Sequence, residues 1–451
     1  QKILRINYMN SSAENRFIYG PTEQSVPKSA DVVIIGGGIV GPGISWAINR
    51  AVPGIKTVLI EQADQLASDQ SAVSASIENI RTCWPAECLA TQMLRSMEII
   101  KNADEYLGDG AAQRLNLRQH GYLYCGFNQK QAEALQSDVK HLHSLGLGHI
   151  EFLDADEVKD SYSWLGPKVV AAKVDPTAGW LDSNALANLY TAAGDNAKFF
   201  FGLENSEIVV RSGKVVGVRT KKGFINTEKV VIAAGAGSRR IGRTAGIDIP
   251  IVVTPRQSFS VPYRDPSIPP DAPFIIGNPA IYMRPDGGTG SIFGWANPWK
   301  NGNVSNTEPY PDSLINPLPL HLLKDWEFPP TVLEMFAQQL GHEEEEGFRN
   351  KGYFRGIKQN IGYYVARAPE ISYKDGQNGR EHYESERAII DKTDIDGLYL
   401  SVAHSGHGIM ASAASGEIMA AWVLGEEKGL NPLFYQFRMN VNYVANDGGI
   451  L

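Results

Sequence analysis

The chain has 451 residues, of which 43% are hydrophobic and 20% are charged, and its formal net charge is −8. This length exceeds one ordinary hydrophobic core and predicts a globular protein with two lobes. The negative charge argues against a nucleic acid or an anionic membrane as partner, because either would repel the molecule. No apolar run reaches the length of a transmembrane helix.

A glycine-rich turn between a strand and a helix opens the predicted fold. Residues 32–35 form a short β-branched run of the kind that is buried in a parallel sheet. The sequence Gly-Gly-Gly-Ile-Val-Gly at 36–41 follows and leads into a helical pattern that ends near residue 50. Residues 57–60 predict the second strand, and Glu61 stands at its end.

Each residue type in this pattern suits the binding of a dinucleotide. Gly36 allows a sharp turn, Gly38 lets the backbone approach a diphosphate, and Gly41 lets the helix lie close to the strand. Unpaired amides at the helix start then face the phosphates. Because Glu61 stands where an acid accepts hydrogen bonds from the adenosine ribose, we expect a bound dinucleotide cofactor.

Two later segments repeat this style of strand and turn. Residues 229–238 indicate a buried strand that ends in small residues, which predicts a second contact with the cofactor. Near the end of the chain, residues 397–403 predict a strand, 404–408 a turn and 409–424 a helix rich in alanine and methionine. We expect this last turn to bring a second helix start to the cofactor.

The segments between these turns have an antiparallel pattern. Apolar and polar residues alternate over 202–224, and residues 281–295 hold two runs around a glycine-rich turn, so both predict hairpins. The predicted fold class is α/β, with a discontinuous Rossmann-like dinucleotide-binding domain interleaved with an antiparallel-sheet substrate domain. The expected boundaries are an arm over 1–30, the dinucleotide-binding domain over 31–80, 160–250 and 385–430, the substrate domain over 81–159 and 251–384, and a tail over 431–451.

Cysteine and histidine usage gives no sign of a metal site. Cys83, Cys88 and Cys125 lack the spacing of metal ligands and are interpreted as reduced thiols. The start of the chain lacks the apolar core of a secretion signal. Together these features favour a cytoplasmic protein without a metal.

The three segments, in this order, resemble the family of flavoenzymes that contains D-amino-acid oxidase, glycine oxidase and sarcosine oxidase. Residues 175–182, Asp-Pro-Thr-Ala-Gly-Trp-Leu-Asp, are similar to the segment that opens a helix in the FAD domain of that family. Residues 254–257, Thr-Pro-Arg-Gln, resemble its crossover into the substrate sheet. Residues 405–408, Ser-Gly-His-Gly, resemble the C-terminal flavin loop of sarcosine oxidases. The resemblance extends over residues 31–430.

The resemblance implies FAD as the cofactor, lying across the ends of the sheet strands. No cysteine follows Cys125 and residues 62–80 contain no histidine, so the attachment points of covalent relatives are absent and FAD is expected to be non-covalent. The helix start after Gly406 would face the N1–C2 edge of the flavin. The residues expected to contact FAD are Gly36, Gly38, Ile39, Val40, Gly41, Glu61, Gln62, Ser68, Ser71, Ser74, Ala75, Ala234, Gly235, Gly237, Gly406, His407, Gly408 and Ile409.

The chemistry implied by the resemblance is removal of a hydride from a carbon next to an amine, giving an imine that hydrolyses. The substrate would be an amino acid or an N-substituted amino acid, and Arg81 would bind its carboxylate with two hydrogen bonds. An ion pair between the lobes is the structural alternative for Arg81. Further catalytic candidates are Tyr282, Tyr363 and His407, with Arg284 and Tyr364 as weaker candidates for the roof of the site.

Two departures from the family pattern affect the expected reaction. Met410 stands where sarcosine oxidases have a second carboxylate anchor, a lysine. Ile292 stands where they have the lysine that activates oxygen, which favours an electron acceptor other than oxygen. Amine oxidation therefore has two alternatives, an FAD dehydrogenase of a hydroxy acid or polyol, and a flavin-bearing subunit or assembly factor of a larger complex. A homo-oligomer is compatible with the sequence.

Overall fold

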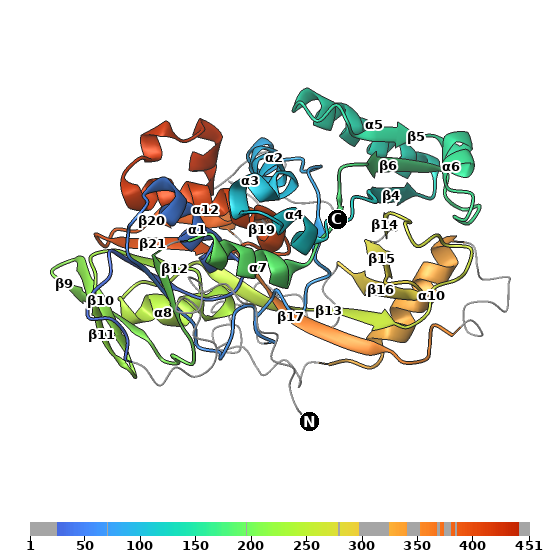
Figure 1. Cartoon of the computed structure of the whole chain (residues 1–451). Helices are drawn as coiled ribbons and strands as arrows, with labels where there is room; N and C mark the ends of the chain where they lie inside the picture. Colours follow the sequence, from blue (N-terminus) through green and yellow to red (C-terminus); the bar gives the residue numbers. More distant parts are fainter. Residues whose placement is uncertain are drawn as a thin grey trace.

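The computed structural model describes residues 25–441, apart from residues 70, 195, 278–279, 297–323, 341–351, 368–369, 374–379 and 384–385. Most of the predicted arm and the last ten residues of the predicted tail lie outside the described residues. Figure 1 shows two large sheets side by side, each with its own helices.

Six short buried strands form the first sheet. Their bounds are β1 Val32–Ile35, β2 Thr57–Ile60, β8 Ala197–Phe200, β12 Val230–Ile232, β20 Ile389–Lys392 and β21 Leu398–Val402. They follow the order β20-β21-β12-β1-β2-β8, and all neighbours are parallel except β20 and β21. Such apolar strands are typical of a sheet covered on both faces. This sheet confirms the predicted Rossmann-like architecture.

Helices cover one face of the six-stranded sheet, and Figure 1 shows α2, α3 and α12 above it. They are α1 Val40–Ala51, α2 Glu87–Lys101, α3 Ala103–Leu107, α4 Ala111–Leu115, α7 Ser183–Ala192 and α12 Gly408–Leu424. Val32 and Ile34 of β1 share one hydrophobic core with Ile44 and Trp46 of α1. Alternate residues of the opening strand thus hold the first helix against the sheet.

The other face of this sheet is covered by a three-stranded meander and a short helix. These elements are β9 Glu207–Arg211, β10 Lys214–Thr220, β11 Gly223–Asn226 and α8 Ser238–Thr244. Val33 and Ile35 of β1 belong to the core on this side. Ser212 and Gly213 form the turn between β9 and β10 with φ of +49° and +77°. Two positive φ values suit a tight hairpin turn, and the predicted hairpins are confirmed.

Eight strands form the second sheet. They are β4 Tyr122–Gly126, β5 Glu151–Leu153, β6 Ala171–Asp175, β13 Ile251–Val261, β14 Phe274–Ile276, β15 Ile281–Asp286, β16 Gly290–Trp295 and β17 Lys358–Arg367. Their order is β17-β13-β16-β15-β14-β4-β6-β5, and only β14 and β4 are parallel neighbours. The hairpin of β15 and β16 confirms the prediction for residues 281–295. Three helices pack against this sheet, α5 Gln129–Ser144, α6 Ala155–Ser161 and α10 Phe328–Leu340.

β13 and β17 join the two halves of the molecule. They pair antiparallel along residues 251–260, and Figure 1 shows them running from beneath the first sheet into the second. Ile251 and Val253 belong to the core of the first half, whereas Phe259 and Val261 belong to the core of the second. The middle of β13 therefore lies between the two halves.

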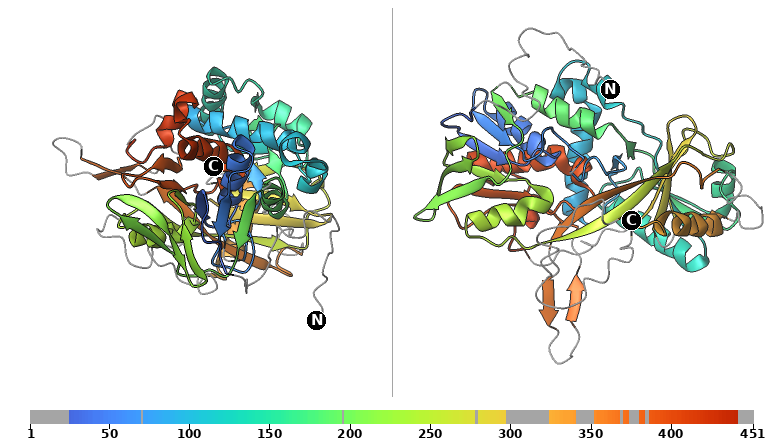
Figure 2. Two further views of the ribbon diagram at one scale, coloured as in Figure 1. Left: turned by 60° about the vertical axis from the view of Figure 1, so that its left-hand side comes forward. Right: turned by 90° about the horizontal axis from the view of Figure 1, so that it is seen from below.

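Several smaller elements complete the described fold. β3 Asn79–Ile80 pairs with β7 Gly179–Trp180. β18 Glu370–Tyr373 pairs with β19 Arg380–Tyr383 in a hairpin that projects from the body in the right-hand view of Figure 2. Short 3-10 turns span Gly235–Gly237, Glu427–Gly429 and Pro432–Phe437.

The structure differs from the predicted domain boundaries in two places. β6 pairs with β4 in the eight-stranded sheet, although the prediction gave residues 160–250 to the dinucleotide-binding domain. α2 packs on α12 in the other half, although the prediction gave residues 81–159 to the substrate domain. The physical reason is that the apolar face of α2 lies in the same core as α1 and α12. Arg95 of α2 adds two hydrogen bonds to the Glu417 carboxylate of α12, at 2.8 and 2.7 Å.

Candidate active site

The glycines of the opening turn have different structural roles. Gly36 has φ of +123°, and a Cβ on it would lie 2.3 Å from the Ala233 carbonyl oxygen. A Cβ on Gly41 would lie 2.0 Å from the Gly36 oxygen, so this glycine lets α1 pack beneath the turn. A Cβ on Gly38 would meet no atom within 4 Å. Gly36 and Gly41 are therefore required by the fold, whereas Gly38 leaves its side of the backbone open to a ligand.

Glu61 is fixed beside this turn. One carboxylate oxygen accepts the amide of Gly37 at 2.5 Å, and the other accepts the amide of Ala63 at 2.8 Å. Glu61 lines the same cavity as Gly36 and Gly38. The acid at the end of the second strand is thus oriented by backbone amides next to the glycine turn.

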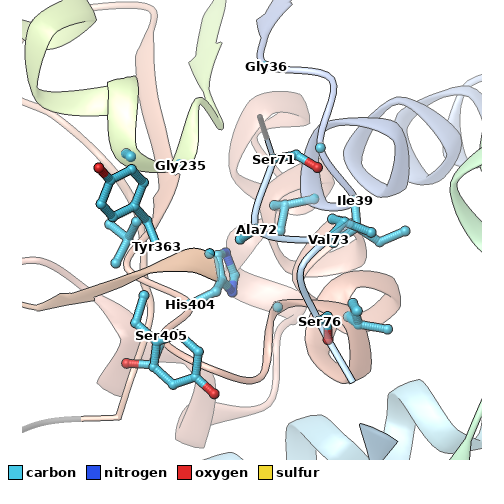
Figure 3. Close-up of a pocket in the computed structure, with 18 of the residues that line it drawn as sticks. Gly36, Ile39, Ser71, Ala72, Val73, Ser76, Gly235, Tyr363, His404 and Ser405 are labelled. Carbon is cyan, nitrogen blue, oxygen red and sulfur yellow. The ribbon is translucent and has the colours of Figure 1, made fainter. Parts of the chain in front are cut away.

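A cavity of about 310 Å³ lies between the starts of α1 and α12. In Figure 3, Gly36, Ile39 and the segment with Ser71, Ala72 and Val73 lie on one side of it, and Gly235, Tyr363, His404 and Ser405 on the other. The two helix starts, far apart in the sequence, therefore meet at one cavity, as the sequence predicts. Their unpaired amides make this cavity suited to an anionic ligand.

Most of the residues predicted to contact a cofactor line this cavity. Gly41 and Ser74 do not, since Gly41 packs under the turn and the Ser74 hydroxyl donates to the Ser71 carbonyl at 3.0 Å. His407 does not line it either. The predicted residues that do are Gly36, Gly38, Ile39, Val40, Glu61, Gln62, Ser68, Ser71, Ala75, Ala234, Gly235, Gly237, Gly406, Gly408 and Ile409.

The sequence matches the profile of one protein family, described as DAO, FAD dependent oxidoreductase, over residues 31–422. The chain belongs to the DAO family. FAD is therefore its cofactor, and it is an oxidoreductase.

Relatives and solved structures agree with this membership. The chain is 24% identical over 431 residues to the FAD-dependent oxidoreductase domain-containing protein 1 homolog of Drosophila melanogaster, covering 87% of this chain and 75% of the relative. Its fold is similar to L-proline dehydrogenase from P. horikoshii, with a TM-score of 0.70, 21% identity and coverage of 92% and 98%. It is also similar to glycine oxidase from Geobacillus kaustophilus, with a TM-score of 0.69, 18% identity and coverage of 92% and 99%.

The cavity of this DAO-family chain has the features that FAD requires. The open backbone at Gly38 and the start of α1 suit the pyrophosphate, and Glu61 suits the ribose. The small residues 233–237 leave room for a flat ring system beside the strand end. None of the described cysteines lines the cavity, and non-covalent attachment of FAD stays a prediction.

Arg81 lies in the cavity wall, and its guanidinium group is held in place. It is only 2% exposed, and Nη1 donates a hydrogen bond of 2.6 Å to the Tyr124 hydroxyl. Its guanidinium carbon lies 4.0 Å from the centre of the Trp84 ring, within range of a cation–π interaction. Asp175 accepts hydrogen bonds from the next two backbone amides, those of Thr82 and Cys83, at 3.1 and 3.3 Å. Arg81 is therefore a rigid part of the wall.

Three tyrosines form an aromatic part of the cavity wall. Tyr282, Tyr363 and Tyr364 line it, and burial raises the pKa of all three phenols, so they stay protonated near neutral pH. A Cβ on Gly294 would lie 2.2 Å from the Tyr282 hydroxyl, and one on Gly406 would lie 2.5 Å from the Tyr364 hydroxyl. These two glycines thus make room for two of the phenols.

The weaker candidate Arg284 lies elsewhere. Its Nε and Nη2 donate to the Ile77 carbonyl at 3.2 and 3.0 Å, and it does not line the cavity. His407 does not line the cavity either; its ring packs edge-on against the lining residue Trp84, with centroids 4.9 Å apart. The flanking residues of the turn, Gly406 and Gly408, line the cavity instead.

Sequence reasoning did not single out several lining residues. Arg256 stood in the quoted segment 254–257 without a role, and Trp84 and Glu386 were not considered. The resemblance of residues 254–257 to a crossover into the substrate sheet was the available signal for Arg256, because a strand that crosses between two lobes places its middle at their junction. Among the described lining residues there is no lysine, and Met410 is one of them.

Other kinds of site have no counterpart in the described chain. Within the residues that the structure covers, no three histidine, cysteine or acidic side chains gather as a metal site would need. None of the helices in that part is both long and apolar enough to cross a membrane.

His404, which lines the cavity, makes the stability depend on pH. Burial lowers its pKa from 6.5 to about 4, so it is neutral in the folded protein, whereas the unfolded chain takes up a proton below pH 6.5. We expect the free energy of unfolding to fall by about 3 kcal/mol as the pH drops from 6.5 to about 4. His407 acts in the same direction, since burial lowers its pKa too.

Urea unfolding at several pH values, with FAD present in excess, measures this effect. The variant His404→Gln should show a shallower fall in the same window, because glutamine does not titrate. An unchanged pH dependence in that variant would contradict the assignment to His404.

Proposed function

We propose that the protein oxidises an amino acid or an N-substituted amino acid at the carbon next to the amine, giving an imine that hydrolyses. The observation that carries this proposal is a pair of opposite charges at one end of the FAD cavity. Arg256 and Glu386 both line it, and the phenol of Tyr364 lies within electrostatic reach of both. A substrate with a carboxylate and an amine matches such a pair, whereas a polyol does not.

Related proteins support the same substrate class. Solved structures with the same fold include L-proline dehydrogenase, glycine oxidase and an L-amino acid deaminase from Proteus vulgaris. Each of these proteins acts, by its name, on an amino acid. Their identity to this chain is 17–21%, so they support the class of substrate through the shared fold but do not identify the side chain of the amino-acid substrate.

Bound FAD supplies the acceptor for the hydride. The residues of the chain supply placement, since a guanidinium group holds a carboxylate in one orientation and so fixes the reacting carbon. Phe274, Tyr122 and Tyr282 form an apolar wall that excludes water from this end. An oxygen of the Glu386 carboxylate lies 3.7 Å from Nδ1 of His407, and Glu386 lines the cavity. In this proposal its carboxylate would face the substrate amine.

Anaerobic reduction of the yellow protein tests this proposal. We expect one or more amino acids or N-methyl amino acids to bleach the flavin absorbance, while the corresponding hydroxy acids and the decarboxylated amines do not. Bleaching by hydroxy acids alone would contradict the proposal in favour of C–O oxidation. Bleaching by none of these compounds would favour the flavin-bearing subunit.

The same samples identify the class of electron acceptor. Since no described lining residue is a lysine, we propose a dehydrogenase that passes electrons to an acceptor other than oxygen. Reoxidation should then be slow in air and fast with a quinone or an artificial dye.

A further inference from the structure

Arg256 is a half-buried cation with two buried hydrogen-bond donors that are unused. Its Nε and Nη1 are buried, and neither has a hydrogen-bond partner in the part of the chain that the structure describes. The guanidinium carbon lies 5.2 Å from the centre of the Tyr364 ring, and the side chain lines the FAD cavity. An arginine in this position leaves N–H donors facing a site without an acceptor from the protein.

Such donors are costly unless a ligand satisfies them. A buried donor without a partner costs about 1–3 kcal/mol, and more when the group is charged. The planar guanidinium fork matches a carboxylate, which accepts two parallel hydrogen bonds from it. The unused donors of Arg256 therefore indicate a bound anion at this point of the cavity.

The position of Arg256 in the fold agrees with a substrate rather than with the phosphates of FAD. It lies in the middle of β13, opposite Gly362 of β17, at the junction of the two halves. A Cβ on Gly362 would lie 2.7 Å from the Ala75 side chain, so the loop before β3 packs directly on this strand pair. The phosphate-binding turn is part of the other end of the cavity, where Arg240 bonds to Gln62 at 3.2 Å and to Asn205 at 2.9 Å.

The two arginines at the substrate end differ in what they already bind. Arg81 donates to Tyr124 and stacks on Trp84, whereas Arg256 has two donors without an acceptor. We propose that Arg256, on the strand that joins the two halves, is the specificity-determining residue that binds the substrate carboxylate. Arg81 is then a positioning residue, which contacts Trp84 of the cavity wall and donates a hydrogen bond to Tyr124. This inference rests on the proposed function.

Binding of simple carboxylates to the FAD-loaded protein tests the assignment without turnover. The probes are acetate and benzoate, each compared with its neutral amide, and the readout is the change in the flavin absorbance spectrum. In Arg256→Met we expect the dissociation constant for the carboxylates to rise roughly 10- to 100-fold and that for the amides to stay unchanged. The dissociation constant of Arg256→Lys for the carboxylates should lie between those of the parent and of Arg256→Met, because lysine keeps the positive charge but lacks the two parallel donors of the guanidinium group.

Arg239→Met is the matched control, since Arg239 pairs with Asp248 outside the cavity, with hydrogen bonds of 2.7 and 2.6 Å. It should bind the carboxylates as the parent protein does. If Arg256→Met does not retain FAD, the carboxylate affinity of Arg256→Lys alone tests the inference. Unchanged carboxylate affinity in the Arg256 variants, or a loss confined to Arg81→Met, would overturn the inference. A parent protein that binds neither carboxylate would instead overturn the proposed carboxylate substrate itself.

Discussion

Replacing Gly36 with alanine should abolish FAD binding and destabilise the protein by about 3 kcal/mol or more. Two effects add at this position. The backbone φ of +123° is strained for any residue with a Cβ, and that Cβ would lie 2.3 Å from the Ala233 oxygen of the neighbouring strand. The conflict is with the backbone at the carboxyl end of the neighbouring strand β12, so no side chain can move to relieve it.

Gly38→Ala is the informative comparison, because it is the same chemical change two residues away. A Cβ there meets no protein atom within 4 Å, so the thermal stability of the FAD-free protein should stay close to that of the parent. The affinity for FAD should still fall, since the methyl group would occupy space beside the pyrophosphate. Flavin content per protein and melting temperature with and without FAD separate the two effects. Equal stability of both FAD-free variants would contradict the roles assigned to the two glycines.

This contrast also shows why the FAD half was predictable from the sequence. Gly36, Gly38 and Glu61 lie within one strand, turn, helix and strand, so their spatial relation follows from local geometry. The turn at residues 404–408 was found for the same reason, because a strand and a helix flank it directly. In both cases the backbone itself makes the site, and the backbone follows the local pattern of glycines and apolar residues.

The substrate end was less predictable because its residues meet only through long-range pairing. Arg256 reaches the cavity through the register of β13 against β17, which joins residues about a hundred positions apart. Glu386 comes from just before β20, at the far end of the chain. No local sequence pattern encodes these relations. Arg81 was proposed from its resemblance to a family residue, and that resemblance gave no information on its hydrogen bond to Tyr124.

The predicted domain for residues 87–101 was wrong for a related reason. The prediction placed residues 81–159 in the substrate domain, but the amphipathic helix α2 within them could cover either sheet by its own sequence. Its apolar residues share the core of α1 and α12, Arg95 forms an ion pair with Glu417 of α12, and Gln92 donates a hydrogen bond to Ser415 at 3.0 Å. Those partners lie over three hundred residues away in sequence.

The second large effect is expected from Gly416, where the two helices of the FAD site cross. A Cβ on Gly416 of α12 would lie 2.5 Å from the Gly43 carbonyl oxygen of α1, and a Cβ on Gly43 would lie 2.9 Å from the Ser412 oxygen. The pair of glycines lets the helix backbones touch, which in turn brings the two helix starts to one cavity. In an exposed helix, a residue with a side chain would instead be favoured over glycine by up to about 1 kcal/mol.

Gly416→Val should therefore force α1 and α12 apart. Overpacking of this kind costs about 1–3 kcal/mol, and here the displaced elements carry the amides that face FAD. We expect a lower melting temperature together with at least a tenfold weaker affinity for FAD, because moving one helix start away from the cavity removes half of its donors. Gly148→Val, at an exposed turn where a Cβ meets nothing within 4 Å, serves as the control and should change neither quantity.

In Gly416→Val, the loss of thermal stability and the loss of FAD affinity should be coupled. If the helices only stabilised the fold, excess FAD would restore the melting temperature of the variant by the same increment as in the parent protein. If their close crossing shapes the FAD site, that increment should shrink, because the binding free energy itself is reduced. A variant with lowered stability but an undiminished FAD increment would show that the crossing of α1 and α12 is independent of the cofactor site.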